Sequence, residues 1–272
     1  MVKSFGGALV VVAAGGVVAQ PAAKEEAKTD ARALHPTITE VLYAVPGGKR
    51  GDADKDGTRS ATGDEFIELV NPHDKPIDLK GYVLTDGAPT PGEATDGKPA
   101  DGKGKGPDES ERRMRFEFPD CELAPGGVVV VFNGFGSSPV GPCGDAEKCP
   151  EPNPQFGGAK VFSMKAANEY QALSNQHDLV LLIAPDGTPV ECIAWDNRQG
   201  APETPKGKNE KQGPVRDKHA LVEGARTERA PKGAGSVERV KAGAPFTPHE
   251  DIDTSGSLYS PGRFPPVPAT GK

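Results

Sequence analysis

The stretch 64-DEFIELVN-71 decides the fold, because it has the pattern of a β-strand that is buried on both faces. Alternate side chains of a strand point to opposite faces, so Ile67 and Leu69 share one face while two other apolar residues flank Glu68 on the opposite face. Pro72 then ends the strand, because proline has no N–H to donate to a sheet. A strand that is apolar on both faces has to be packed between two layers.

Further apolar segments of strand length occur along the chain. Valine, isoleucine and aromatic residues dominate several of them, and glycine, proline, asparagine or aspartate bounds most of them, as is typical of strands. Almost no segment has a sustained helical period. Short strands separated by turns predict an antiparallel β-sandwich or barrel. The segments are 38-ITEVLYAV-45, 77-IDLKGYVL-84, 114-MRFEF-118, 128-VVVVF-132, 179-LVLLIA-184 and 190-VECIAW-195.

Two turns indicate how neighbouring strands are arranged. Asp186-Gly187 separates the last two segments, and Asp-Gly favours a tight hairpin in which both central residues have positive φ. We therefore expect these two strands to pair. The turn 123-LAPGG-127 leads directly into 128-VVVVF-132, a strand with no polar residue, which we expect to be central in its sheet.

In this order the segments resemble the lamin tail domain, an immunoglobulin-like module of nuclear lamins and of many exported bacterial proteins. The resemblance implies an all-β, immunoglobulin-like antiparallel β-sandwich over residues 37–264. Three segments with almost no apolar residues, near 87–112, 134–158 and 197–234, are interpreted as long irregular insertions that depart from the lamins. The chain has no heptad rod, so a filament role is not implied. The resemblance implies instead a non-enzymatic binding or structural module. It is carried by 38-ITEVLY-43, 64-DEFIELVN-71, 76-PIDLKGYVLTD-86, Phe116 to Gly134, Asn175 to Asp196, 236-SVERV-240 and 260-SPGRF-264.

The N-terminal residues have the pattern of a targeting segment. Lys3 precedes the apolar run 5-FGGALVVVAAGGVVA-19, which is short and rich in small residues. We expect residues 1–19 to be a signal peptide, with an uncleaved anchor as the alternative. Residues 20–36 are then a disordered or partly helical linker, and 265–272 a C-terminal tail. Export predicts a secreted, periplasmic or cell-surface protein with no membrane span after cleavage.

The charge balance bears on the class of partner. The chain has 272 residues, with 32 basic and 39 acidic side chains and a formal net charge of -7. Nucleic acids and anionic lipids bind concentrated basic faces, so we expect neither as the main partner. A protein or a component of the cell envelope is the expected partner.

The four cysteines are interpreted as disulfide-bonded, because an even count is typical of exported proteins. Cys143 and Cys149 enclose a loop short enough to close locally, and Cys121 and Cys192 lie beside strand segments that could be bridged. The sequence leaves all three pairings open. Zinc binding is the competing interpretation, and the absence of a C-x2-C pair disfavours it.

The stretch 51-GDADKDGTRSATGDE-65 matches the first half of a calcium-binding loop, with alternating aspartates before a glycine at the sharp turn. The second half lacks the bidentate glutamate of an EF-hand, and no helix is predicted on either side. Two interpretations stay open: a weak calcium site, or a solvated acidic turn. The candidate metal ligands are Asp52, Asp54, Asp56, the carbonyl of Thr58, Asp64 and Glu65.

No catalytic motif of the H-E-x-x-H or G-x-S-x-G type occurs, so we predict that the protein is not an enzyme. The five histidines fall in predicted turns, linkers or insertions. His177 and His249 each lie beside an acid and are interpreted as surface histidines. Two alternative functions remain: a secreted metal-dependent hydrolase or nuclease with a site assembled from loops, and calcium-dependent adhesion at the cell surface.

Overall fold

Strand β2, Phe66–Val70, lies in the interior of a six-stranded sheet. It pairs antiparallel with β1, Thr37–Leu42, on one side and with β7, Val128–Phe132, on the other. All five residues of β2 are buried, as the alternation of its apolar side chains predicts. The expected central position of β7 is also confirmed, because β7 lies between β2 and β8.

The computed structural model describes residues 34–87, 113–137, 141–144, 147–197, 222, 224–253 and 255–265. The chain divides into two units, Met1–Ala31 and Arg32–Lys272, and every described residue belongs to the second. None of the described helices is long and apolar enough to cross a membrane.

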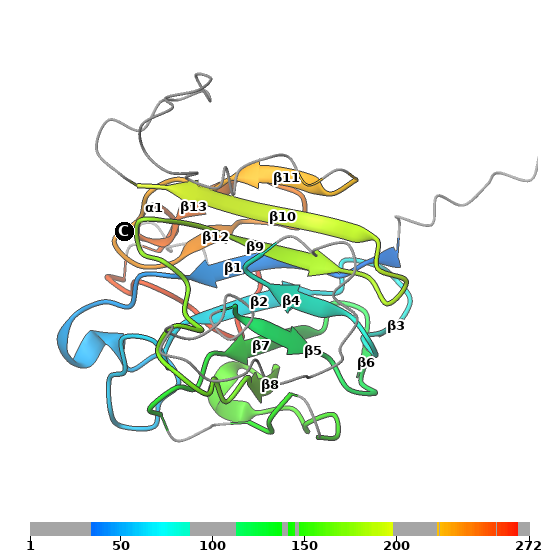
Figure 1. Ribbon diagram of the computed structural model, residues 1–272, viewed down its shortest axis with the longest axis horizontal. Helices are drawn as coiled ribbons and strands as arrows, with labels where there is room; N and C mark the ends of the chain where they lie inside the picture. The colour runs from blue at the N-terminus through cyan, green and yellow to red at the C-terminus, as the bar shows by residue number, and fades with distance from the viewer. Residues whose placement is uncertain are drawn as a thin grey trace, which may run out of the picture. The chain divides into compact units, whose positions relative to one another are not determined.

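Three sheets form within the described residues (Figure 1). The six-stranded sheet has the order β13-β12-β1-β2-β7-β8, the five-stranded sheet β11-β10-β9-β4-β5, and a small sheet joins β3 to β6. The remaining strands are β3 (Ile77–Asp78), β4 (Val83–Thr85), β5 (Arg115–Glu117), β6 (Glu122–Leu123), β8 (Lys160–Ser163), β9 (His177–Ile183), β10 (Pro189–Asp196), β11 (Arg226–Arg229), β12 (Val237–Arg239) and β13 (Phe246–Pro248). The helical turns are η2 (Gly48–Gly51), η3 (Pro154–Phe156) and α1 (His249–Ile252).

The pairing of two edge strands corrects the expectation of a purely antiparallel sandwich. β8 pairs parallel with β7, and β11 pairs parallel with β10. Parallel neighbours need a long crossover connection, and the connecting segments 133–159 and 197–225 supply it. The other strand pairs are antiparallel, so the fold remains an immunoglobulin-like, almost all-β sandwich.

The main core lies between the two large sheets and contains Ile67 and Leu69 from one sheet and Trp195 from the other. Trp195 is fully buried, and its ring stacks on that of Tyr43 with the centroids 4.3 Å apart. The indole Nε1 donates a hydrogen bond of 2.7 Å to the Ser174 carbonyl. Trp195 therefore has a packing role in the core.

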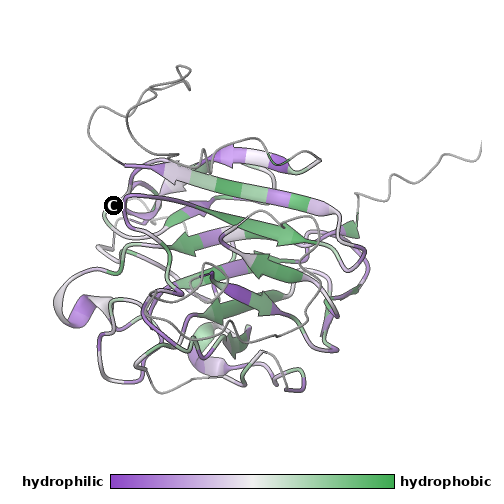
Figure 2. Cartoon of the chain, viewed as in Figure 1, coloured by the Kyte–Doolittle hydropathy of each residue, from purple (hydrophilic) through white to green (hydrophobic). Residues whose placement is uncertain are grey.

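A second apolar cluster covers the outer face of the six-stranded sheet. Phe66, Phe132 and Phe156 belong to it, and Tyr259 of the C-terminal segment packs against it. This cluster explains why β2 is buried on both faces. Figure 2 shows the contrast with β11, an edge strand of the other sheet, which is mostly hydrophilic.

The hairpin between β9 and β10 forms at Asp186-Gly187 as predicted, but its geometry differs. Gly187 has a φ of +85°, whereas Asp186 is not among the non-glycine residues with positive φ in the described part of the chain. The Asp186 carboxylate accepts a hydrogen bond of 2.9 Å from the Thr188 amide. The Ala184 amide donates to the Thr188 carbonyl, so three residues lie in the turn instead of two. The register of the strand pair also shifts at the start of β10, between Pro189 and Glu191.

The structure corrects the expected disulfides. Cys121 is bonded to Cys149, whereas Cys143 and Cys192 are free. Cys192 belongs to a small cluster with Leu179, while Cys121 lies in the main core. The two side chains therefore lie on opposite sides of the five-stranded sheet, and they cannot meet.

Candidate metal centres

The acidic loop connects β1 to β2 and is held by local backbone turns. Gly57 has a φ of +94° and Lys55 a φ of +61°, so the chain reverses tightly around the aspartates. The Ser60 hydroxyl donates a hydrogen bond of 2.8 Å to the Phe135 carbonyl, which ties the loop to the segment that follows β7. The loop is thus fixed at both strands and at a distant point of the chain.

Asp64 is the residue that closes the loop. It is fully buried, and its Oδ1 atom accepts hydrogen bonds of 2.6 Å from the Ala53 amide and 3.0 Å from the Asp54 amide. Its Oδ2 atom accepts a third, of 2.6 Å, from the Ser60 amide. These amides hold the carboxylate in one orientation, as a pre-formed metal ligand requires.

Asp54 has the most unusual environment in the loop. Its side chain is buried, and Oδ1 accepts a hydrogen bond from the Asp56 amide. Burial raises the pKa of Asp54 to about 7, and the negative charges of Asp64 and Asp56 contribute to the rise. Oδ2 and the buried Ser137 hydroxyl oxygen each make no well-formed hydrogen bond among the described residues, although the Ser137 hydroxyl is near enough to lower the pKa of Asp54 slightly. A buried carboxylate oxygen without a well-formed hydrogen bond is rare and calls for a proton or a cation.

Asp52 completes the group. One carboxylate oxygen each from Asp52, Asp54 and Asp64 lies within 4.8 Å of the others, close enough for one cation to contact all three. Oxygen ligands of this kind suit calcium and magnesium. The structure thus brings together three of the six ligands that the sequence predicts.

The other three predicted ligands do not join this group. Asp56 accepts a hydrogen bond of 2.6 Å from the Thr58 amide in a local turn, and Thr58 is exposed. Glu65 is buried elsewhere, where its Oε2 atom accepts a hydrogen bond from the Leu173 amide. Glu65 follows Asp64 directly as the chain enters β2, so the two side chains point in opposite directions.

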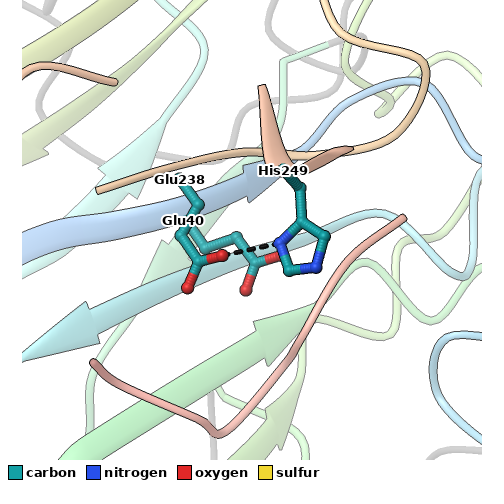
Figure 3. Close-up of side chains that lie close together, drawn as sticks. All are labelled: Glu40, Glu238 and His249. Atoms are coloured by element: carbon teal, nitrogen blue, oxygen red, sulfur yellow. Dashed lines mark hydrogen bonds and ion pairs between the residues drawn. The ribbon is translucent and has the colours of Figure 1, made fainter. Parts of the chain in front are cut away.

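A second group of ligand-type side chains was not found from the sequence (Figure 3). Glu40, Glu238 and His249 are all buried, and their ligand atoms lie within 4.8 Å of one another. The interpretation of His249 as a surface histidine is therefore wrong, because its side chain is only 1% exposed. Its Nδ1 atom lies 2.6 Å from Glu238 Oε2 and 3.8 Å from Glu40 Oε1. Burial raises the pKa of Glu40 and that of Glu238 to about 8.

The sequence contains a weak signal for this second group, because Glu40 lies in the mostly apolar segment 38-ITEVLY-43 and Glu238 lies between two valines in 236-SVERV-240. The strand register that places Glu238 opposite Glu40 is not visible in the sequence. His177 lies in β9, opposite Asp196, and neither it nor His249 belongs to the Asp52 group.

Comparison with known proteins agrees with this architecture. The family model of the lamin tail domain matches residues 29–197, which is more than half of the chain. Comparison with curated proteins gave no match. The match includes β1 to β10, while β12 lies beyond it and still pairs with β1. The chain therefore belongs to the lamin tail domain family.

Proposed function

We propose that this protein is an exported, non-enzymatic binding module whose acidic loop takes up a calcium ion. Lamin tail domains are immunoglobulin-like, non-catalytic domains of the protein-interaction type, which supports a binding role. The observation that carries the calcium proposal is the convergence of Asp52, Asp54 and Asp64, with the Oδ2 atom of Asp54 buried and without a well-formed hydrogen bond among the described residues.

Calcium suits this group better than a softer metal, because the three side chains offer only carboxylate oxygens. The three carboxylates repel one another, and a divalent cation would remove the repulsion. The site lacks the bidentate glutamate of a full EF-hand set, so we expect weak binding, with a Kd of about 10⁻⁴–10⁻³ M, as in extracellular calcium modules.

The role of the ion would be to stiffen the connection between β1 and β2. The loop contacts the segment after β7 through Ser60 and reaches Gln155 through the Lys55 side chain. Lys55 also lies 4.3 Å above the ring of Phe156. A calcium-fixed loop would present these joined segments as one rigid surface to a protein or a component of the cell envelope.

Export is proposed on two grounds. The N-terminal residues 1–19 have the composition of a signal peptide. The bond between Cys121 and Cys149 is of a type that persists in oxidising compartments such as the periplasm or the medium. Millimolar calcium is also available outside the cell, which fits a weak site.

The thermal unfolding midpoint of the full chain, with and without millimolar calcium chloride, tests the calcium site. We expect calcium to raise Tm of the wild type, because a ligand that binds only the folded state stabilises it. Asp54→Asn should remove this rise while keeping the hydrogen bond that Oδ1 accepts. Asp74→Asn, at an exposed aspartate outside the loop, is the matched control and should respond like the wild type. Equal responses of all three proteins would refute the site.

Calcium-dependent adhesion is the second candidate function, and the same three carboxylates favour it. It predicts that the protein is retained on the cell surface in calcium and released by a chelator, and that Asp54→Asn abolishes the retention. A protein that binds calcium in solution but is not retained would keep the first proposal and exclude adhesion.

A further inference from the structure

Three glutamates form a row across neighbouring strands on the outer face of the six-stranded sheet. The register places Glu238 of β12 opposite Glu40 of β1, and Glu40 opposite Glu68 of β2. All three side chains are fully buried. Like charges directly opposite in a sheet are destabilising, and burial increases the cost because water no longer screens them.

In the described part of the chain, His249 is the one basic side chain that forms an ion pair with this row. Among the described residues, no lysine or arginine forms an ion pair with Glu40, Glu68 or Glu238. Neutral donors serve part of the row, because the Ser236 hydroxyl and the Ser260 amide donate to Glu40, and the Thr39 hydroxyl and the Gly262 amide donate to Glu68. Ser260 Oγ lies 3.2 Å from Glu40 Oε2 and also 3.2 Å from Glu238 Oε1. One hydroxyl proton can serve only one of the two carboxylates. The carboxylates of Glu40 and Glu238 therefore share one hydroxyl proton, and these neutral donors do not balance the negative charge of the row, as a cation would.

His249 adds a nitrogen ligand and the arrangement that surrounds ligating histidines. Its Nδ1 atom points at the carboxylates of Glu238 and Glu40 (Figure 3). Its Nε2 atom lies 3.6 Å from Asp253 Oδ2 and makes no hydrogen bond among the described residues. A histidine that binds a metal through one nitrogen usually directs the other towards a carboxylate or carbonyl. The residue is fixed at the start of α1 by its backbone amide, which donates to the Ser236 carbonyl.

We propose that Glu40, Glu238 and His249 bind a divalent transition-metal ion of the zinc type, as a structural centre distinct from the calcium loop. Two carboxylate oxygens and one imidazole nitrogen are zinc ligands, whereas calcium takes oxygen alone. The Ser260 hydroxyl lies beside both carboxylates and is placed to complete the coordination.

The role of the ion follows from where its ligands lie in the chain. Glu40 belongs to the part that matches the lamin tail family, whereas Glu238 and His249 lie beyond residue 197, where the match ends. The C-terminal segment also caps the row, because the Gly262 amide donates a hydrogen bond of 2.7 Å to Glu68. A metal ion would therefore fasten β12, α1 and the residues around Ser260 onto the family core.

The metal content of the full chain tests this centre directly. The protein is unfolded in denaturant that contains a chelator and is then refolded in the presence of zinc chloride. After unbound metal has been removed, mass spectrometry measures the zinc content per chain. We expect one zinc per wild-type chain and a loss of most of it in His249→Gln and in Glu238→Gln. His177→Gln, at a half-buried strand histidine, and Asp54→Asn, in the calcium loop, are the controls and should retain the metal.

The nature of the bound ligands can be tested on the wild type alone, so the test does not depend on whether the variants fold. X-ray absorption at the zinc edge should show nitrogen and oxygen neighbours at about 2.0–2.2 Å. Sulfur neighbours at about 2.3 Å would place the zinc on Cys143 or Cys192 instead and would overturn the proposal. A wild-type chain without zinc, or a His249→Gln variant with undiminished zinc, would overturn it too.

Discussion

Arg239 of β12 forms an ion pair with Glu191 of β10, with 2.7 Å between Nη2 and Oε1, and so joins the two large sheets inside the protein. The arginine is fully buried, and its Nη1 atom lies 2.8 Å from Glu228 of β11. Its Nε atom donates to the Ile38 carbonyl, and the guanidinium lies 4.1 Å above the ring of Phe246. All parts of the guanidinium are thus used, which a lysine could not imitate.

Replacing Arg239 with methionine should lower the free energy of unfolding by about 3–5 kcal/mol, because the buried carboxylate of Glu191 is left without its partner. Urea unfolding followed by tryptophan fluorescence measures the loss. The exposed pair between Arg115 and Glu117 supplies the control, since Arg115→Met should cost less than about 1 kcal/mol. Equal losses in the two variants would show that the inter-sheet pair does not stabilise the fold.

The burial of Glu65 predicts that the free energy of unfolding depends on pH. Burial raises its pKa well above the usual 4.5, and the charges of Asp178 and Asp86 add to the effect. The folded state therefore favours the protonated form. The stabilisation that Glu65 contributes to the folded state is fully present below pH 4.5, and it is lost as the pH rises through the folded-state pKa of Glu65.

Glu65→Gln should remove this loss, because glutamine keeps an oxygen that can accept from the Leu173 amide and does not ionise. The variant should be more stable than the wild type above neutral pH and similar to it near pH ~4, where the wild-type carboxyl is protonated in the folded state. Unfolding midpoints in urea across this range measure the difference. Two parallel curves would show that Glu65 does not change its protonation on folding.

The disulfide gives a prediction about both pairing and stability. Cys121→Ser or Cys149→Ser should lower the free energy of unfolding by about 2–4 kcal/mol, because the bond closes a loop between residues that are 28 apart in the sequence. Cys143→Ser should have little effect, because that thiol is free. A thiol assay of the denatured, unreduced chain should detect two free cysteines. A cost for Cys143→Ser as large as that for Cys149→Ser would contradict the pairing.

The parts of the fold that the sequence predicts are those encoded by local pattern. The two apolar faces of Phe66–Val70 and the unbroken run Val128–Phe132 mark interior strands without reference to other segments. β8 and β11 were missed for a physical reason. Both are short edge strands that pair in parallel after long connections, and β11 consists of 226-RTER-229, with no apolar residue. Their backbone hydrogen bonds come from the partner strand and leave no trace in the side chains.

For the candidate sites too, the sequence predicts the residues that are close along the chain and not those that only the fold brings together. Asp52 and Asp54 are close in the sequence, so their spacing reveals them, whereas the choice of Asp64 over Glu65 depends on which side each faces as the chain enters β2. Glu40 meets Glu238 because β12 pairs with β1, and His249 joins them because it directly follows β13, which pairs with β12. No local pattern specifies either register. A buried charge cluster built from distant strands is therefore a property of the fold.

The calcium-binding isotherm of the full chain, measured by titration calorimetry beside that of Asp54→Asn, tests the central claim most directly. We predict that the wild type binds one calcium ion at Asp52, Asp54 and Asp64, with a Kd of about 10⁻⁴–10⁻³ M, and that the variant shows no binding in this range. A wild-type isotherm without calcium binding, or an identical isotherm from the variant, would contradict the account and leave the loop as a buried acidic turn.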